Sequence, residues 1–466
     1  MKKSTLTEMA CTGIDLLRRD DPQLYQLLEL ENQRQNEVLA MVAASSVADP
    51  SVLACNGSAT VNVTTEGYPG ARFHAGCVHI DEIERLAVSR AKAAFHAQYA
   101  NVQPHSGSSA NAVVIFSLLK AGETILGLDL DSGGHLTHGS KASVSGQYFN
   151  AVGYGLTAQG LIDYDQVHAL AKQHRPKLII CGASAYPRVI DFKRFREIAD
   201  DVGAYLLADI SHIAGLVVAG VHPSPVDHAH FTTTSTYKQL YGPRGGLILM
   251  GKDHEAPAPD GKKNLTQMVQ RGVFPYFQGT PDLAAIASKA RALDWVMQPG
   301  FKTIAQRIVD DAKKLAELVT KQGYRVLTGG TDNHIVLIDV LSTRNITGVI
   351  AEKALEECNI VINKNRIPGD KKSALVASGA RLGTNSLALR GMGPETMPEC
   401  ADLMHRVLSA VKAEDDHRYS LDDEIKRSCK EQVKTLCQRF PLPHYGSGAT
   451  HSRNEHSDSK LANKII

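Results

Sequence analysis

The sequence predicts an α/β fold, with a mainly parallel sheet flanked by helices and a smaller C-terminal α+β domain. Two observations lead to this prediction. Between about residues 82 and 250, short apolar runs typical of strands alternate with runs of helical spacing, as in parallel strands joined by crossover helices. The chain also has 466 residues, 43% of them hydrophobic and 21% charged, which is ordinary for a globular protein of more than one domain.

Within that alternating region the individual elements can be placed from their periodicity. Apolar residues recur at helical spacing in three stretches, and four short runs are bounded by turn residues. The expected helices lie near 83–96, 109–121 and 164–174, and the expected strands lie at 124–128, 177–181, 204–209 and 246–250. We expect these strands to belong to one mainly parallel sheet.

The flanking regions are less regular. Residues 13–46 have helical spacing, with Asp21 and Pro22 suited to cap a helix start, whereas 47–80 are rich in Gly, Thr and Pro and are expected to be irregular. A long helix is expected over 282–322, followed by strands near 324–340 and helices near 347–357 and 394–414. We therefore divide the chain into a helical arm (1–60), a large domain (61–295), a small domain (296–445) and a disordered polar tail (446–466).

Charge and cysteine content argue against several classes of partner. Fifty-one basic and 49 acidic residues leave a net charge of +2, which favours neither nucleic acid nor an anionic membrane. The eight cysteines are scattered, with no Cys-x-x-Cys pair and no zinc-type spacing, so we expect reduced thiols, no metal and a cytoplasmic location. The first residues have no apolar segment of the kind found in a signal peptide.

The most informative stretch surrounds Lys238. A Thr/Ser run leads into this lysine, and the sequence GPRGG follows at 242–246. About thirty residues earlier, an apolar strand-like run ends in Asp209. Enzymes that use pyridoxal 5'-phosphate need a lysine for covalent attachment and an acid facing the ring nitrogen, so that the ring can accept electrons. The pattern therefore indicates that cofactor.

Five other residues carry chemistry that fits such a site. Gly107 and Ser108 begin a helical stretch and suit a phosphate, although an ordinary helix cap would have the same residues. His135 follows a Gly-Gly turn and has a flat ring that suits stacking, or it is a hydrogen-bonded surface group. Arg381 could pair with a carboxylate and Glu66 could transfer a proton, and each could equally be a solvated side chain or part of a turn.

Taken together, these segments resemble serine hydroxymethyltransferase, a family of fold-type I pyridoxal phosphate enzymes. The resemblance covers roughly residues 20–440 and implies a large-domain sheet of the seven-stranded type. It rests on EGYPG at 66–70, NVQPHSGS at 101–108, GGHLTHG at 133–139, DISHIAG at 209–215, TTT at 232–234, Lys238, GPRGG at 242–246, NKN at 363–365 and Arg381. So many motifs in the same order are not expected by coincidence, and the resemblance favours the functional interpretation of each.

The resemblance implies a role for each matching residue. Lys238 would hold the cofactor, Asp209 would face its ring nitrogen and His135 would stack on its ring. Arg381 would bind the substrate carboxylate, and Glu66 would transfer a proton near tetrahydrofolate, the co-substrate. Further cofactor contacts would come from Gly107, Ser108, Ser184, His212, Tyr237 and Gly279, and further folate contacts from Leu130, Gly134, Leu136 and Asn365. The family also implies a homodimer, or a dimer of dimers, in which the partner subunit supplies the Glu66 loop.

The chain departs from the family pattern mainly around the substrate. Thr64 stands where the family has tyrosine, Phe73 and His74 replace a tyrosine pair, Ala44 replaces a serine and Tyr237 replaces a histidine. The family's Gly-Gly-Pro loop is GTP at 279–281. Loss of the tyrosine ring at position 64 would leave room for a side chain on the substrate's α-carbon.

This pattern leads us to favour a changed acceptor. We expect a hydroxymethyltransferase of the α-methylserine branch, which transfers a one-carbon unit from tetrahydrofolate to alanine and forms 2-methylserine. One alternative is an ordinary serine hydroxymethyltransferase, and another is a folate-independent aldolase or transaldolase for β-hydroxy amino acids, which Phe73 would permit. A catalytically inactive relative is a further alternative, against which Lys238, Asp209, His135 and Arg381 argue.

Overall fold

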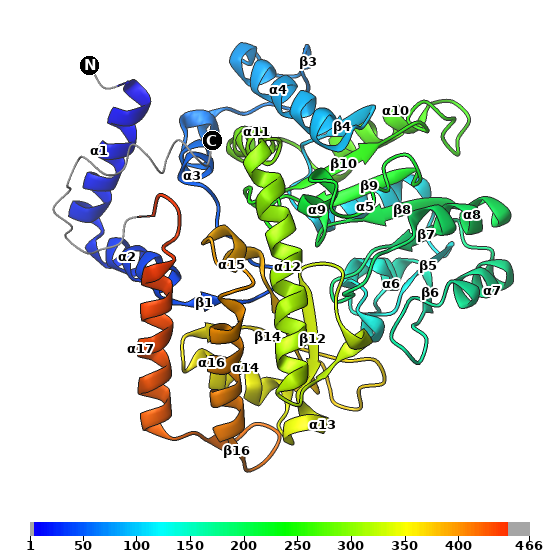
Figure 1. Cartoon of the computed structure of the whole chain (residues 1–466). Helices are drawn as coiled ribbons and strands as arrows, with labels where there is room; N and C mark the ends of the chain where they lie inside the picture. The colour runs from blue at the N-terminus through cyan, green and yellow to red at the C-terminus, as the bar shows by residue number, and fades with distance from the viewer. Residues whose placement is uncertain (1–3, 446–466) are drawn as a thin grey trace.

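The computed structural model describes residues 4–445 and has the expected α/β architecture (Figure 1). A seven-stranded sheet has the order β4-β10-β9-β8-β7-β5-β6. The five strands from β9 to β6 run parallel, and β10 is antiparallel to both of its neighbours, so the prediction of a mainly parallel sheet is confirmed. The strands are β4 (Tyr99–Asn101), β5 (Thr124–Leu128), β6 (Asn150–Tyr154), β7 (Leu178–Cys181), β8 (Tyr205–Asp209), β9 (Phe231–Ser235) and β10 (Gly246–Met250).

Helices cover both faces of this sheet because its central strands are apolar on both sides. In β8, Leu206 and Ala208 pack into one hydrophobic core, whereas Leu207 between them packs into another. The first core includes α4 (Val78–Phe95), α7 (Tyr164–His174), α8 (Phe192–Val202), α9 (Ala214–Val218) and α11 (Leu283–Val296). The second includes α5 (Gly107–Leu118) and α10 (Leu265–Arg271).

A second, smaller sheet has its own core in the C-terminal part of the chain. Its four strands are antiparallel in the order β11-β12-β15-β14, and β1 near the N-terminus pairs separately with β13. The elements are β1 (Leu39–Ala40), β11 (Arg325–Val326), β12 (Ile335–Asp339), α13 (Val340–Arg344), α14 (Gly348–Glu356), β13 (Ile360–Val361), β14 (Asn363–Asn365), β15 (Gly379–Gly383), α15 (Asn385–Leu389), α16 (Met397–Ala410), β16 (Lys412–Ala413), β17 (Tyr419–Ser420) and α17 (Asp423–Arg439).

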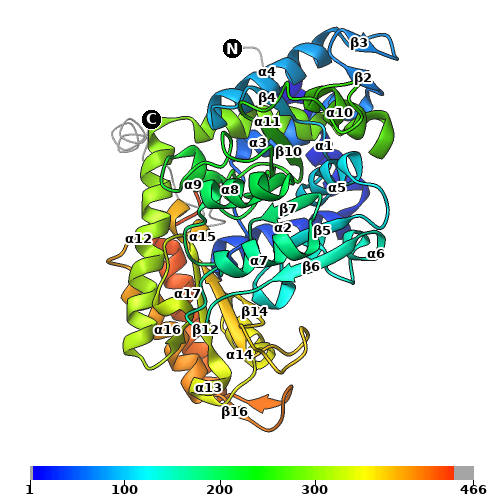
Figure 2. The same cartoon turned by 90° about the vertical axis from the view of Figure 1, so that its right-hand side faces the viewer.

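One long helix, α12 (Pro299–Lys321), belongs to both parts of the molecule. Its first half, including Phe301 and Ile308, packs into the core of the large sheet, and its second half, including Leu315 and Val319, packs into the core of the small sheet. Figure 2 shows α12 running along the edge of both parts. The predicted domain boundary at 295/296 therefore falls just before a helix that the two cores share.

Three expectations about local structure are wrong. The stretch 13–46 is two helices, α1 (Thr5–Asp20) and α2 (Pro22–Glu37), followed by extended chain, because the next residues pair as β1 with β13. The predicted helix at 282–322 is interrupted at Met297 and Gln298, before Pro299 opens α12. The irregular stretch 47–80 contains the helix α3 (Pro50–Asn56), the short turn η1 (Ala59–Asn62), the small strands β2 (Gly67–Tyr68) and β3 (Ala71–Arg72) and the start of α4.

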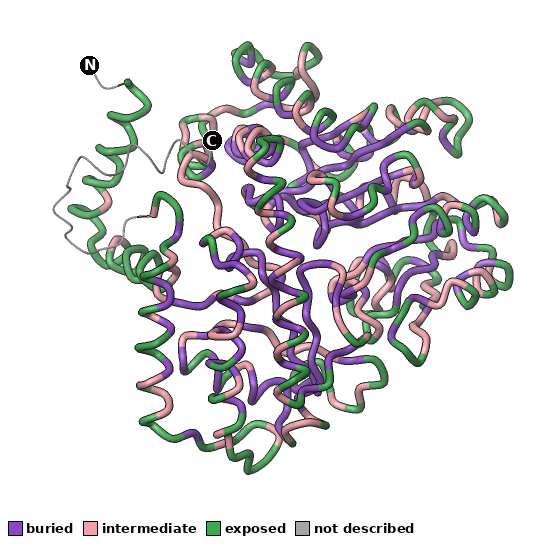
Figure 3. Tube along the Cα trace, viewed as in Figure 1, coloured by how far each residue is buried: buried purple, intermediate pink, exposed green. Residues whose placement is uncertain are grey.

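The expected cap at the start of α2 is confirmed, since the Asp21 side chain accepts the N–H of Leu24 ahead of Pro22. Neither α1 nor α2 buries a residue (Figure 3), although both have exposed apolar side chains, such as Ile14 in α1 and Leu27 in α2. Within residues 4–445, no helix has the length and apolar character needed to cross a bilayer. The predicted tail at 446–466 lies outside the described residues.

Asp311 on α12 is buried, and neither of its carboxylate oxygens has a hydrogen-bond partner among the described residues. Burial raises the pKa of the Asp311 carboxyl to about 8, and Arg307 opposes that rise. The folded state therefore keeps a proton that the unfolded state has released, so this carboxyl weakens folding increasingly as pH rises from about 4 to about 8.

We predict that Asp311→Asn becomes more stable than the parent protein as pH rises. The difference in unfolding free energy should grow by about 1–3 kcal/mol between about pH 5 and about pH 8, because the amide does not ionise. Urea unfolding at both pH values measures it, and Asp310→Asn, which changes the half-buried neighbour, is the control. A difference independent of pH would contradict the prediction.

Candidate functional site

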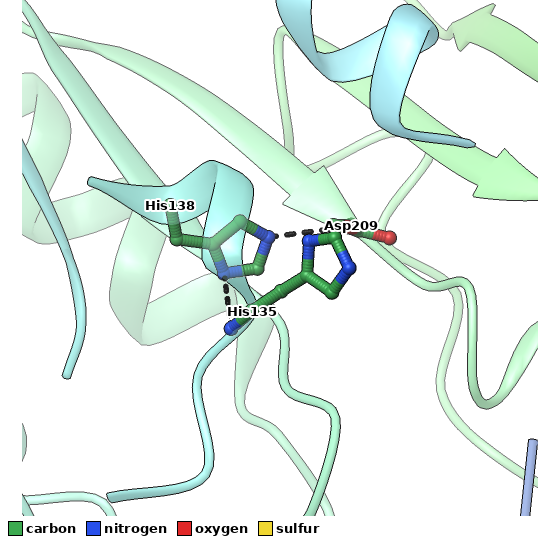
Figure 4. Close-up of side chains that lie close together, drawn as sticks. All are labelled: His135, His138 and Asp209. Atoms are coloured by element: carbon green, nitrogen blue, oxygen red, sulfur yellow. Dashed lines mark hydrogen bonds and ion pairs between the residues drawn. The ribbon is translucent and has the colours of Figure 1, made fainter. Parts of the chain in front are cut away.

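The site is organised around Asp209, a buried carboxylate at the carboxyl end of β8. Its Oδ2 accepts a hydrogen bond from Asn111 Nδ2 at 2.8 Å. The same oxygen accepts from His138 Nε2 at 3.1 Å, as Figure 4 shows. Its Oδ1 accepts from the backbone N–H of Ser211 at 3.0 Å and from the Ser211 hydroxyl at 2.6 Å. Four donors from three separate segments therefore converge on one carboxylate.

These donors keep Asp209 ionised. Burial alone would raise the pKa of the Asp209 carboxyl, but the hydrogen bond from His138 and the other donors outweigh it and hold that pKa below its usual range. His138 Nδ1 accepts the backbone N–H of His135 at 3.5 Å, which leaves Nε2 as the nitrogen that donates to Asp209. The site thus holds a fixed negative charge at the end of the sheet.

His135 lies beside this carboxylate with its ring held in place. Its Nδ1 is 2.7 Å from the Thr137 hydroxyl, which in turn accepts from Asn111 Nδ2 at 2.9 Å. Burial lowers the pKa of the His135 imidazole to about 4, so the ring is neutral near pH 7. A neutral, oriented ring suits stacking on a flat ligand.

Lys238 is buried in the turn between β9 and β10. Burial lowers the pKa of its ammonium to about 8; the positive charges of Arg381 and Arg244 add to the shift, while Asp209 opposes it. Cζ of Arg244 lies 3.7 Å from the centroid of the neighbouring Tyr237 ring. The Tyr237 carbonyl accepts a hydrogen bond from the Ser46 hydroxyl. Lys238 therefore has a larger unprotonated fraction near neutral pH than an exposed lysine, and the unprotonated amine is the form that attacks.

The N-terminus of α5 provides an anion site next to this lysine and carboxylate. The Ser106 and Ser109 side chains cap the helix reciprocally, and the N–H groups of Gly107 and Ser108 lie in its first turn, outside the ladder of i to i−4 bonds. A Cβ at Gly107 would lie 3.1 Å from Cβ of Ser235, whose buried hydroxyl has no partner among the described residues. The backbone N–H of Ser235 donates to Ser211, which links this helix start to Asp209.

Arg381 reaches the same region from β15 of the small sheet. Its Nη1 donates to the Ser184 carbonyl, and its Nε donates to Asn363 Oδ1 at 3.0 Å. Burial lowers the pKa of the Arg381 guanidinium to about 10, and no carboxylate pairs with it in the part of the chain that the structure describes. It is therefore a buried cation available to a carboxylate ligand.

His212 follows β8 and is also buried near this group. Its ring stacks on that of His334, with centroids 5.6 Å apart. Burial lowers the pKa of the His212 imidazole well below its usual value, and the charges of Lys238 and Arg381 lower it further. His212 is therefore a neutral hydrogen-bonding group near the two cations.

The structure leaves several predicted site residues outside this group. Glu66 is half-buried and lies beside Gly279, where a Cβ would be 3.0 Å from its Oε1. No hydrogen bond or ion pair within residues 4–445 joins Glu66 to Lys238 or Asp209. Thr64, His74, Leu130 and Leu136 are exposed, Ala44 and Asn365 are half-buried and Gly134 is buried. Glu66 and Gly279 thus form a second group, apart from the one around Lys238.

Three contributors have no role in the sequence prediction: His138, Asn111 and Ser235. A local signal existed for two of them. His138 lies three residues after His135, so one tight turn carries both rings, and Asn111 lies one helical turn after Gly107, on the face of α5 that meets the sheet. No pattern in the sequence indicates that His138 and Asn111 both contact Asp209, because Asn111 and Asp209 are 98 residues apart in the chain.

Comparison with known proteins identifies the family. The model of the family "Serine hydroxymethyltransferase" matches residues 17–404. The chain belongs to the serine hydroxymethyltransferase family. A protein of Alkalilimnicola ehrlichii named "Serine hydroxymethyltransferase" is 47% identical over 427 residues, which cover 91% of this chain and 97% of that protein. This enzyme is accordingly a fold-type I transferase of one-carbon metabolism, with pyridoxal phosphate as cofactor and tetrahydrofolate as co-substrate.

The residues of this family member fit pyridoxal phosphate. The α5 N-terminus and the unpartnered Ser235 hydroxyl could hold the phosphate, and the ionised Asp209 could hold a protonated ring nitrogen. Lys238 has the lowered pKa that covalent attachment requires. His135 presents a neutral ring for stacking.

We predict that Lys238 in the apoenzyme titrates near pH 8, well below an exposed lysine, because it is buried close to two cations. The rate of acylation by acetic anhydride as a function of pH, resolved by peptide mass spectrometry, measures this titration. Lys193, whose side chain is 75% exposed, is the internal control. Arg244→Gln should move the Lys238 titration upward, since it removes one of those charges; a Lys238 profile that follows Lys193 would refute the assignment.

Proposed function

We propose that this enzyme interconverts serine and glycine, with tetrahydrofolate carrying the one-carbon unit. The relative that is 47% identical over nearly its whole length is named for that activity, and this observation carries the proposal. The intact group around Lys238 and the buried Arg381 support it, since they supply a covalent attachment point and a site for a small amino acid carboxylate. This proposal replaces alanine as our favoured acceptor.

Each residue of the Lys238 group has a proposed task. Lys238 attaches the cofactor, Gly107 and Ser108 bind its phosphate, and Asp209 holds a proton on its ring nitrogen. When bound, pyridoxal phosphate provides an electron sink for negative charge on the substrate's α-carbon. His135 stacks on the ring, while Ser184, His212 and Tyr237 make further contacts to the cofactor.

Substrate orientation and proton transfer fall to other residues. Arg381 would bind the amino acid carboxylate and thereby orient the bonds at its α-carbon. Glu66 holds or releases a proton at the substrate hydroxyl or at the folate nitrogen. Leu130, Gly134, Leu136 and Asn365 are proposed to line the folate site.

We further infer a homodimer in which each site combines the Lys238 group of one subunit with the Glu66 and Gly279 group of the other. Two observations support this inference. Glu66 and Gly279 lie together but share no bond with the Lys238 group within the described residues. The helices α1 and α2 also expose apolar side chains along their length, as a surface covered by a second copy would.

Alanine remains the second candidate acceptor, with 2-methylserine as product. Three substitutions favour it. Thr64 and His74 each replace a tyrosine that is usual in the family, and Ala44 replaces a serine and so has no hydroxyl. Thr64 and His74 are exposed in the single chain, so their effect on substrate choice would act through the site of the partner subunit.

The two acceptors are distinguished by amino acid release in parallel assays. With tetrahydrofolate, we expect glycine release from L-serine to exceed alanine release from 2-methylserine by about 10-fold or more, the usual discrimination for one methyl group. Thr64→Tyr should widen that ratio if Thr64 provides room for the methyl group, and Thr60→Tyr on η1 is a control in the same segment. Faster alanine release would reverse the proposal in favour of the α-methyl substrate.

A second prediction concerns Lys238 itself. Lys238→Ala should lower turnover by roughly a thousandfold or more with either substrate, because the positioned amine is lost. The same variant should bind pyridoxal phosphate reversibly, without a covalent adduct after borohydride reduction. Wild-type turnover in this variant would show that another lysine attaches the cofactor.

A further inference from the structure

Lys289 on α11 is a buried lysine that the proposed chemistry does not use. It is 2% exposed, and its Nζ donates to the backbone carbonyls of Val102 at 2.6 Å, Pro104 at 3.1 Å and Gly246 at 3.2 Å. An ammonium group has three N–H donors, so each donor has one carbonyl. The side chain is fully committed to the backbone of two other segments.

No carboxylate forms an ion pair with Lys289 within residues 4–445. Burial lowers the pKa of its ammonium to about 7, whereas the charges of Asp282 and Glu84 act in the opposite direction. Burying a cation without a countercharge is costly, and an apolar side chain of similar length would avoid the cost. The role of Lys289 therefore depends on the segments to which these three carbonyls belong.

All three carbonyls belong to segments that form the cofactor site. Val102 and Pro104 lie in the loop between β4 and α5, directly before the helix start at Gly107. Gly246 begins β10, at the end of the turn that contains Lys238, and its N–H donates to the Pro104 carbonyl at 2.9 Å. A Cβ at Gly245 would lie 2.2 Å from Lys289 Cε, so the lysine packs directly against this turn.

Gln103, which lies between Val102 and Pro104, connects this loop to the segments around Glu66 and Gly279. Gln103 Nε2 donates to the Gly67 carbonyl at 2.9 Å and to Glu84 Oε1 at 2.8 Å, and the Gln103 carbonyl accepts from Gln278 at 2.9 Å. Gly67 follows Glu66, and Gln278 precedes Gly279. The loop that Lys289 holds is thus also the contact between the two groups of site residues.

We propose that Lys289 is a positioning residue for the cofactor phosphate. It acts through the loop before α5 and through the Gly245–Gly246 turn, fixing the N–H groups of the helix start relative to Lys238. It does not touch the cofactor. The proposal rests on the phosphate role of Gly107 and Ser108 proposed above.

The test compares two ligands that differ only in the phosphate. Apoenzymes of the parent protein and of Lys289→Met are titrated with pyridoxal phosphate and with pyridoxal. We expect Lys289→Met to weaken pyridoxal phosphate binding by about 10- to 100-fold, as for the loss of hydrogen bonds from a charged group, and to change pyridoxal binding by less than about 3-fold. Lys289→Gln keeps two N–H donors, so its affinity for pyridoxal phosphate should lie between those of the parent protein and Lys289→Met. If Lys289→Met does not fold, Lys289→Gln takes its place in the test.

Ser288→Ala is the matched control, because Ser288 is buried on the same helix but bonds to Val52 and Ala284, away from the loop. It should leave both affinities unchanged. Equal weakening of both ligands by Lys289→Met would show a general scaffold role and overturn the proposal, as would no weakening of either.

Gly107→Ala separates failure of this inference from failure of the proposed phosphate site. If Gly107→Ala weakens pyridoxal phosphate binding selectively while Lys289→Met does not, the role of Lys289 is wrong and the phosphate site stands. If Gly107→Ala has no effect on pyridoxal phosphate binding, the phosphate site itself is wrong, and the role of Lys289 fails with it.

Discussion

The buried charge of Asp209 is the constraint on which the arrangement of the site depends. A carboxylate at this depth would take up a proton unless donors surrounded it, and here they come from α5, from the turn at 136–138 and from the chain after β8. Each donor is itself held by a neighbour, as Thr233 holds Asn111 at 2.5 Å. The ionised state of Asp209 therefore requires these three segments to be held in fixed positions relative to one another.

The cations of the site outnumber this charge. Lys238 and Arg381 are both buried, and burial lowers the pKa of each, so the group around Asp209 holds an excess of positive charge. An anionic cofactor and a substrate carboxylate would relieve it. Ligands that bind only the folded state stabilise it in proportion to their affinity and concentration, so the assembled enzyme is expected to gain stability as these groups bind.

The sequence predicted those parts of the molecule that have a local cause. Apolar runs and turn residues located the central strands, small hydroxyl residues located the start of α5, and the polar turn located Lys238 beside a strand-end carboxylate. The errors arose where distant segments decide. The chain after Glu37 is extended because it pairs with β13, more than 300 residues later, and no local pattern indicates such a pairing. Likewise, Lys289 lies in an apolar helical run and shows its importance only through carbonyls that are far away in sequence.

The shared helix α12 has a consequence for how this enzyme can move. It has 23 residues, is about 34 Å long and is anchored at one end in each core. Rotation of the small sheet about a hinge would have to bend this helix or pull one end from its core. Arg381, whose guanidinium already reaches the Ser184 carbonyl across the boundary, is thus prepositioned before substrate arrives. We therefore expect the substrate to bind without a large closure of the small sheet onto the large one. Selectivity should then depend mainly on the shape of the preformed pocket.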